Sequence, residues 1–507
     1  MTLKAALRLA AISFITGTSV LAQQQAPPPT PQDSATASAT TPALSSDNHK
    51  LGRLDFAVNW RARVEGWDWF KGTTGNGNYT FGDSLLRVAI GQHTEYLDWF
   101  LEGAQVGLVE VPDKAVVAAP QGQLGLGGNY YAANSNNTND VGGFLKQGFV
   151  KFKNAGSSIE LGRFEYFDGL EVKPKDPTLA NLIETRVSQR LISNFGFSTV
   201  ERSFDGVQVS SNLGHDNFTL LAARPTEGVF QVDGMGELDI DTYYGAFTMP
   251  VETAHSAGEL RVFGLCYIDH CTLTLKTDNR PASVRATDLD KIEIATYGAD
   301  YVHVFNTSTA GKFNLLGWVA LQGGSWGELT QRASAFVGEV GWQPAAETLK
   351  PWLSAGYSYG SGDGNNADAR HGTFFQVLPT PRQYARFPFY NMMNNEDLYA
   401  TLNLRPVSKL ALRTEVHTLR LANAKDLWYS GGGAFQGNTF GYTGRPNPGD
   451  GSRGLANVWD LSVDYRFTHS FSANVYYGHA WGKTVVDNIY PRDPNGQLLY
   501  LETDFRY

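Results

Sequence analysis

The chain has 507 residues, with 54 Gly, 29 Phe, 23 Tyr and 11 Trp but only two Cys and five Met. Its formal net charge is −9, which argues against a nucleic-acid partner because such proteins carry a strongly basic surface. No apolar run beyond the N-terminus reaches the ~18 residues of a transmembrane helix, so the sequence excludes a helical membrane protein. Abundant glycine and aromatic residues are typical of a chain built from β-strands and turns.

The first segment, residues 1–22, has the features of a secretory signal peptide. Lys4 and Arg8 precede an apolar stretch that starts at Leu9, and Ala22 comes directly before the predicted cleavage site. The alternative is an N-terminal membrane anchor, although the apolar stretch is shorter than the ~20 residues that a spanning helix needs. Residues 23–50 are rich in Pro, Gln, Ser and Thr, so we expect a disordered linker. Residues 51–507 then form the folded domain.

The folded domain is dominated by an alternation of apolar and polar residues. In RLDFAVNWRARVE, from Arg53 to Glu65, every second residue is apolar and most of the others are polar or charged. This pattern predicts β-strands with one buried and one polar face. About 18 segments show it, with those between 199 and 305 the least regular. The segments are 53–67, 78–92, 94–111, 143–153, 157–168, 199–213, 216–224, 238–251, 258–270, 291–305, 311–327, 331–343, 349–360, 396–407, 409–421, 456–467, 471–482 and 498–507.

The connections between these segments alternate in length. Every second one is short, whereas the others are mostly long: about 112–142, 169–198, 271–290, 361–395 and 422–455. A soluble all-β protein with several sandwiches has no reason to alternate in this way. A transmembrane barrel does, because it has tight periplasmic turns at one end and long extracellular loops at the other. We therefore predict an all-β fold, a transmembrane antiparallel β-barrel of about 18 strands in the bacterial outer membrane, wide enough for an aqueous channel.

The last ten residues, LLYLETDFRY, form a strongly amphipathic strand. Leu499, Leu501 and Phe505 alternate with Glu502 and Asp504. Since a barrel in lipid can leave no strand edge unpaired, we expect this strand to close the barrel by pairing with the first strand near residue 53. A terminal strand that ends in an aromatic residue also resembles the signal that the barrel assembly machinery recognises.

Motifs for catalysis or cofactor binding are weak. GGSWG (323–327) and GYSYG (356–360) match the nucleophile-elbow pattern, but both fall at the ends of predicted strands rather than at a strand-to-helix turn. We expect no enzyme activity and no cofactor. Asp363, Asn365 and Asp368 form a weak candidate site for Ca²⁺, although they lack the glycine and the glutamate of an EF-hand.

Cys266 and Cys271 are five residues apart. In the oxidising cell envelope a small disulfide loop with a structural role is expected, and two reduced thiols are the alternative.

Arginine is the most informative residue type for function. Two sets are candidates for the substrate path: Arg61, Arg63, Arg87, Arg405, Arg413 and Arg466 on predicted inward faces, and Arg163, Arg190, Arg202, Arg382 and Arg386 near strand ends or in loops. One hypothesis is that acidic residues pair with them across a polar lumen. The other is that some remain unpaired and bind a passing anion, for which the planar, permanently charged guanidinium is suited.

Three stretches resemble the alginate export family of outer-membrane barrels. They are residues 359–406, the segment RLISNFGFSTVERSFDGVQV with Arg202–Gly206 at its core, and residues 419–445. The resemblance implies an 18-stranded barrel that exports an anionic uronate polysaccharide through an arginine-lined lumen, with loops that gate the pore.

Together these features predict a passive outer-membrane channel for uronate polysaccharide or oligosaccharide such as alginate. Its expected partners are outer-membrane lipid, that saccharide, the assembly machinery and periplasmic export components. A general or substrate-specific porin that imports small solutes is the alternative. A barrel enzyme or an adhesin is a third class, but the chain lacks a nucleophile–base pair and a passenger domain.

Overall fold

The structure is a computed structural model that describes residues 49–507 except 273–274, 382–386, 388–389 and 448–450. The predicted signal peptide and residues 23–48 of the predicted linker lie outside these residues. The last residues of that predicted linker begin strand β1 (His49–Leu51), which pairs antiparallel with the next strand. None of the helices in the described part of the chain is long and apolar enough to cross a membrane.

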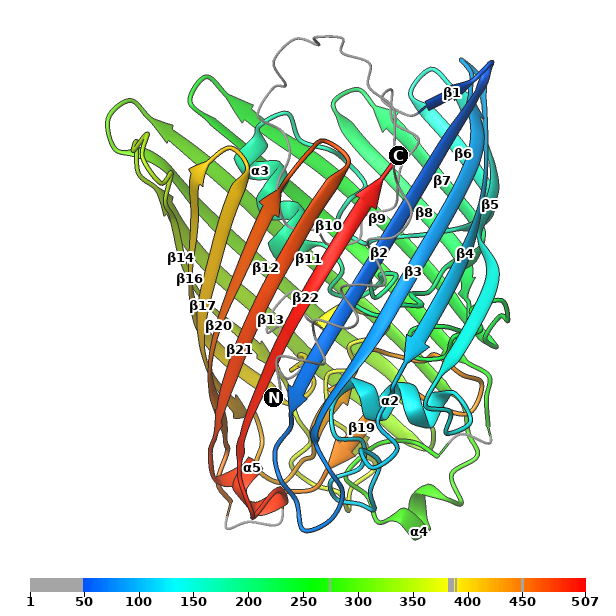
Figure 1. Ribbon diagram of the computed structural model, residues 1–507, viewed down its shortest axis with the longest axis vertical. Helices are drawn as coiled ribbons and strands as arrows, with labels where there is room; N and C mark the ends of the chain where they lie inside the picture. Colours follow the sequence, from blue (N-terminus) through cyan, green and yellow to red (C-terminus); the bar gives the residue numbers. More distant parts are fainter. Residues whose placement is uncertain (1–48, 273–274, 382–386, 388–389, 448–450) are drawn as a thin grey trace.

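Eighteen antiparallel strands form a closed barrel (Figure 1). The wall strands are β2 (Leu54–Asp68), β3 (Asn78–His93), β4 (Leu97–Val109), β5 (Asp140–Asn154), β6 (Ser157–Phe164), β7 (Phe204–Leu213), β8 (Asp216–Pro225), β9 (Ile240–Thr253), β10 (Ser256–Asp269), β11 (Ile292–Thr307), β12 (Gly311–Trp326), β13 (Leu329–Gln343), β14 (Trp352–Gly360), β16 (Asn395–Val407), β17 (Leu410–Leu421), β20 (Gly454–Arg466), β21 (Phe471–Gly482) and β22 (Asn495–Arg506). The predicted fold class and strand number are confirmed.

The remaining elements are short and lie in the connections. They are the strands β15 (Arg370–His371), β18 (Trp428–Gly431) and β19 (Tyr442–Arg445), and the helices α2 (Leu126–Ala133), α3 (Pro177–Leu182), α4 (Ala282–Arg285) and α5 (Thr484–Ile489). A π-helical turn, η1 (Ile183–Val187), continues α3. Strands β18 and β19 pair as a hairpin that is separate from the wall.

The first and last wall strands close the barrel. Strand β22 pairs with β2 in a regular antiparallel register, and the backbone N–H and C=O of Val58 both bond to Tyr507 at 2.8 Å. The C-terminal segment is therefore the closing strand, as predicted. Since every wall strand has two partners, no edge is left, which a sheet surrounded by lipid requires.

The two ends of the barrel differ in their connections. At one end, here called the short-turn end, most connections have two to four residues, and both β1 and the C-terminus lie there (Figure 1). At the other, the long-loop end, the longest connections span 110–139, 165–203, 270–291, 361–394 and 422–453. The predicted alternation is thus confirmed, apart from the tight turn between β12 and β13 at the long-loop end.

The inner face of the wall has two zones. On β22, Glu502 and Asp504 point inward near the short turns, whereas Leu498 and Tyr500 point inward near the long loops, and all four are buried. Strands β2, β17 and β20 repeat this order. On these four strands the prediction of a polar inner face therefore holds for the short-turn half only, because long loops fold into the other half and cover it with apolar side chains.

Candidate functional site

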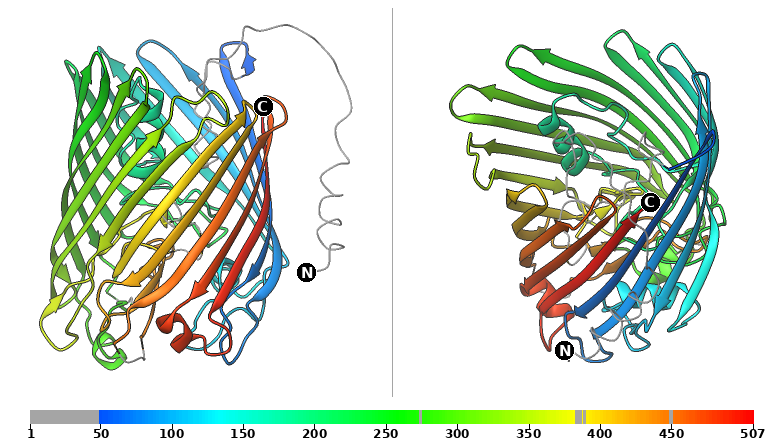
Figure 2. Two further views of the ribbon diagram at one scale, coloured as in Figure 1. Left: turned by 90° about the vertical axis from the view of Figure 1, so that its left-hand side faces the viewer. Right: turned by 45° about the horizontal axis from the view of Figure 1, so that its top comes forward.

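Loop 165–203 does not stay outside the barrel but runs through its interior (Figure 2). It leaves the wall at the long-loop end, yet Asp176 accepts a hydrogen bond from Lys312 Nζ at 3.0 Å, and Thr178 Oγ1 donates to Gln343 Oε1 at 3.2 Å. Lys312 and Gln343 both lie at the short-turn end. The loop thus extends along the length of the lumen, and the segment 199–203, predicted as the start of a strand, belongs to it.

A cluster of buried charges anchors this loop to the wall. Arg87 Nη1 of β3 lies 3.2 Å from Glu201 Oε2, and Arg87 Nη2 lies 3.0 Å from Glu165 Oε2 and 2.6 Å from Glu102 Oε1. Lys146 Nζ of β5 lies 3.3 Å from Glu165 Oε1. Burial raises the pKa of Glu201, in the loop, to about 7, although Lys146 and Arg87 oppose this shift. Such groups stay buried only when they are paired, so the cluster holds the loop in place.

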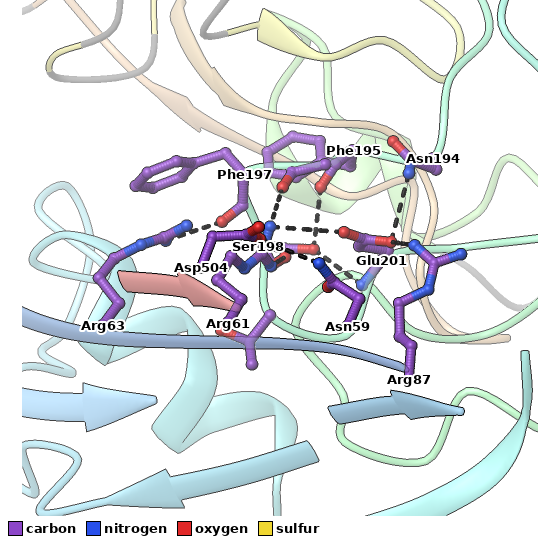
Figure 3. A network of polar contacts seen from close by, with 12 residues as sticks. Asn59, Arg61, Arg63, Arg87, Asn194, Phe195, Phe197, Ser198, Glu201 and Asp504 are labelled. Atoms are coloured by element: carbon purple, nitrogen blue, oxygen red, sulfur yellow. Dashed lines mark hydrogen bonds and ion pairs between the residues drawn. The ribbon is translucent and has the colours of Figure 1, made fainter. Parts of the chain in front are cut away.

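Two further arginines hold the loop through its backbone (Figure 3). Arg61 donates to the carbonyl oxygens of Gly196 at 2.7 Å and Ser198 at 2.6 Å. Arg63 donates to the carbonyl oxygen of Phe197 at 2.9 Å and forms an ion pair with Glu502 at 2.5 Å. These guanidinium groups are buried and used in structure, which leaves them little capacity to bind a passing anion.

Two other long loops join the first inside the barrel. Leu378 N donates to Leu191 O at 2.8 Å and Ser193 N donates to Leu378 O at 2.9 Å, so loop 361–394 pairs with loop 165–203 as a short parallel ladder. Loop 422–453 adds the β18–β19 hairpin, which is bridged to Tyr390. We call the described residues of these three loops the plug. Its apolar side chains pack against the wall in the long-loop half.

A cavity of about 880 Å³ remains in the short-turn half, between α3 with η1 and the wall from β12 to β20. We call it the vestibule. Its lining includes six basic residues, Lys173, Arg186, Lys312, Lys350, Arg405 and Arg413, and four acidic ones, Glu184, Glu339, Glu347 and Asp464. Lys173 and Lys350 are exposed and have no ion pair among the described residues, whereas Arg186 pairs with Glu339 at 2.7 Å. The lining therefore has two more basic than acidic residues, although Lys312 and Arg413 are paired with Asp176 and Glu415 next to it.

The profile of the family described as alginate export matches residues 185–488, which is more than half of the chain. The chain belongs to the alginate export family. A search of curated proteins by sequence found no match.

Solved outer-membrane proteins share the fold of this alginate export family member. OccK9 (OpdG) of Pseudomonas aeruginosa aligns with a TM-score of 0.55 at 10% identity and covers 89% of this chain and 98% of its own. OccAB2 of Acinetobacter baumannii gives a TM-score of 0.55 at 9% identity over 89% and 98% of the two chains. OpdK of P. aeruginosa gives 0.52 at 7% identity over 89% and 99%. The protein is an outer-membrane channel, and its short-turn end faces the periplasm.

The candidate arginines of this alginate export barrel have several different roles. Arg61, Arg63, Arg87, Arg163 and Arg413 form ion pairs with wall or plug carboxylates, the last two with Asp205 and Glu415, each at 2.5 Å. Arg405 and Arg413 line the vestibule, and Arg466 ends β20 at the short-turn end. The Arg190 guanidinium stacks 5.4 Å from the Trp318 ring. Arg382 and Arg386 lie outside the described residues.

Arg202 has no carboxylate within ion-pair distance in the described chain. It is fully buried, bonds to the Gly432 carbonyl, and has two guanidinium nitrogens without a hydrogen-bond partner. Burial lowers its pKa to about 10.

Sequence reasoning missed Lys173, Lys312 and Lys350 of the vestibule, because they lie in loops or at strand ends, where the alternation of apolar and polar residues gives no information.

The predicted disulfide is wrong, since both cysteines are reduced. Cys266 lies on β10 and is exposed on the outer face of the wall, whereas Cys271 follows the end of that strand and its Sγ contacts Gly437 O at 2.9 Å. An odd separation along an extended chain points the two side chains to opposite faces.

The candidate Ca²⁺ site is not supported either. Asp363 Oδ1 accepts the backbone N–H of Asn365 at 2.9 Å, and Asp368 Oδ2 accepts from the Asn365 amide at 3.1 Å. Loop hydrogen bonds thus use the proposed ligand oxygens. Across the described residues no cluster of three or more His, Cys, Asp or Glu side chains could hold a metal ion.

Proposed function

We propose that this channel passes anionic uronate saccharide, such as alginate or its oligosaccharides, by passive diffusion. The observation that carries the proposal is the vestibule, with six basic and four acidic residues around about 880 Å³ of space that lies on the periplasmic side. A uronate chain carries one carboxylate per sugar, so a basic chamber concentrates it. The alginate export family match supports the same substrate class.

The charges of the vestibule suit passage rather than tight binding. Arg186 and Lys312 already have carboxylate partners, so Lys173 and Lys350 are the cations best placed to contact a saccharide. Each exposed contact contributes only about 0.2–1 kcal/mol. Several weak contacts in series attract a polyanion without trapping it, as conduction requires.

A porin that imports small solutes is the second candidate. The plug favours it, because three loops occupy the long-loop half and restrict the bore there. A related structure of OpdK was solved with vanillate, which is a small carboxylate. Under this alternative the vestibule would bind small anions, and long saccharide chains would not enter.

Ion currents through single channels in planar bilayers separate the two candidates. Oligomannuronate of increasing length, added on the periplasmic side, should block the current with an affinity that rises with the number of sugars, because longer chains make more contacts. Neutral oligosaccharide of equal length is the control and should not block. Block by small carboxylates alone, with no effect of chain length, would favour the porin. Periplasmic export components as partners stay a prediction of the family resemblance.

A further inference from the structure

A second, smaller cavity of about 90 Å³ lies in the long-loop half, against the β18–β19 hairpin. We call it the hairpin cavity. Its lining contains one charged residue, Arg445, and no Asp or Glu. Aromatic rings of Trp69, Phe195 and Tyr442 form much of the remaining wall. The hairpin cavity is thus a chamber lined by aromatic rings and neutral polar groups, with a single positive charge.

The charge of Arg445 has no counterion in the described part of the chain. The side chain is almost fully buried, and no carboxylate lies within ion-pair distance. Its guanidinium lies 5.1 Å from the Trp428 ring. Buried arginines on the wall strands, such as Arg61, Arg63 and Arg87, are instead paired with acids. An isolated buried charge is strongly unfavourable, so an anion at this place would remove a large penalty.

The hydrogen bonds of Arg445 leave capacity for such an anion. Nε donates to Gln121 O at 3.0 Å and to Tyr490 Oη at 2.9 Å, Nη2 donates to Gln123 O at 3.0 Å, and Nη1 donates to Ser430 Oγ. A guanidinium has five N–H groups, so one N–H remains on each terminal nitrogen. Two such groups on one planar fork match the two oxygens of a carboxylate.

The rest of the hairpin cavity supports an anion of carboxylate size. Asn129 and Thr439 contribute further polar groups to the lining. The small volume of the hairpin cavity accommodates a carboxylate and the atoms next to it but not several sugars. Arg202, which also has no carboxylate within ion-pair distance in the described chain, lies near Tyr442 and adds positive potential there.

We propose that the hairpin cavity is an anion site in which Arg445 binds one carboxylate of a sugar acid. The identity of the carboxylate as that of a uronate rests on the proposed function. The existence of the anion site does not rest on it. The site lies in the long-loop half of the barrel, whereas the vestibule lies in the short-turn half.

Calorimetric titration of the detergent-purified full chain tests the site. Sodium D-glucuronate should bind in chloride-free buffer, whereas D-glucose, which has a hydroxymethyl group in place of the carboxylate, should not. R445Q should weaken glucuronate binding at least ten-fold, and R453Q, at a half-exposed arginine of the same loop, should not change it. Because Arg445 also joins several loops, N129L is a second variant that leaves its hydrogen bonds intact and narrows the cavity, and it should weaken binding several-fold.

Equal glucuronate binding by the wild type, R445Q and N129L would overturn the site, and so would binding of chloride with no binding of glucuronate. These outcomes are separate from the proposed function. If oligomannuronate blocks the wild-type current and R445Q leaves both block and binding unchanged, the channel function stands and the site fails. If glucuronate binds through Arg445 but no uronate chain blocks the current, the site stands and uronate transport fails.

Discussion

Arg87 on strand β3 and Glu201 in the plug form an ion pair of 3.2 Å between Nη1 and Oε2, although they are 114 residues apart in the sequence. This contact shows what the lumen arginines mainly do. They join an inward-folded loop to the wall, and their charges are neutralised by the carboxylates of Glu102, Glu165 and Glu201.

Replacing Arg87 by Gln should loosen the plug. Removing one partner of a buried ion pair destabilises a structure by about 3–5 kcal/mol, because the remaining charges lose their compensation. We expect single channels of R87Q to show larger and more frequent conductance fluctuations than wild type. R224Q is the matched control, since Arg224 forms only partly exposed ion pairs, and it should behave like wild type. A steady wild-type current in R87Q would show that the cluster does not hold the loop.

The docking of loop 165–203 should depend on pH. Burial raises the pKa of Glu201 to about 7 and that of Asp168 to about 6, so both loop carboxylates hold protons that they would release if the loop left its site. Raising the pH from about 4 to about 7 therefore makes docking of the loop less favourable, and the effect ends above the folded-state pKa. Current fluctuations should increase over this pH range, and the increase should be smaller in E201Q. More fluctuation at acidic pH would contradict the assignment.

Deleting Phe505–Tyr507 should prevent insertion rather than reduce conductance. Strand β22 closes the barrel against β2, and Tyr507 makes two backbone hydrogen bonds to Val58. Without these residues two strand ends lose partners inside the membrane. Heat-modifiable mobility of the outer-membrane fraction on a gel measures insertion. A truncated protein that inserts and shows the folded mobility would disprove the role of this strand end.

Both cysteines should react with a thiol reagent in denatured protein that has not been reduced. Cys266 and Cys271 are separate in the structure, so mass spectrometry should find two alkyl groups per chain. A chain without alkyl groups would indicate the disulfide that the spacing suggested.

Alternation within the strands, together with the alternating lengths of the connections, was enough to predict the barrel, because membrane strands must present an apolar face to lipid along their whole length. The closing strand at residues 498–507 is one example, and it was placed within three residues of its observed start. The plug was not predicted, since its contacts join residues far apart. Nothing in the local sequence around Arg61 indicates that its partners are the carbonyl oxygens of Gly196 and Ser198.

The candidate site could be predicted only in part for the same reason. The inward direction of Arg61, Arg63 and Arg87 was correct, but whether an inward arginine is paired depends on loops whose path the alternation does not encode. Arg445 in the hairpin cavity could have been suspected only from its place in the stretch 419–445 that resembles the family. Lys350 lies in a turn, where no periodic signal exists.

The most direct test of the central claim is the block of single-channel current by oligomannuronate in the variant K173Q/K350Q. These two lysines are the vestibule cations without an ion pair in the described structure, and each contact contributes about 0.2–1 kcal/mol. In K173Q/K350Q the dissociation constant for block by oligomannuronate from the periplasmic side should rise about ten-fold. The variant K291Q/K425Q, at the long-loop end, should be blocked with the same constant as the wild type. An unchanged constant in K173Q/K350Q would contradict the vestibule as the place where anionic saccharide is received.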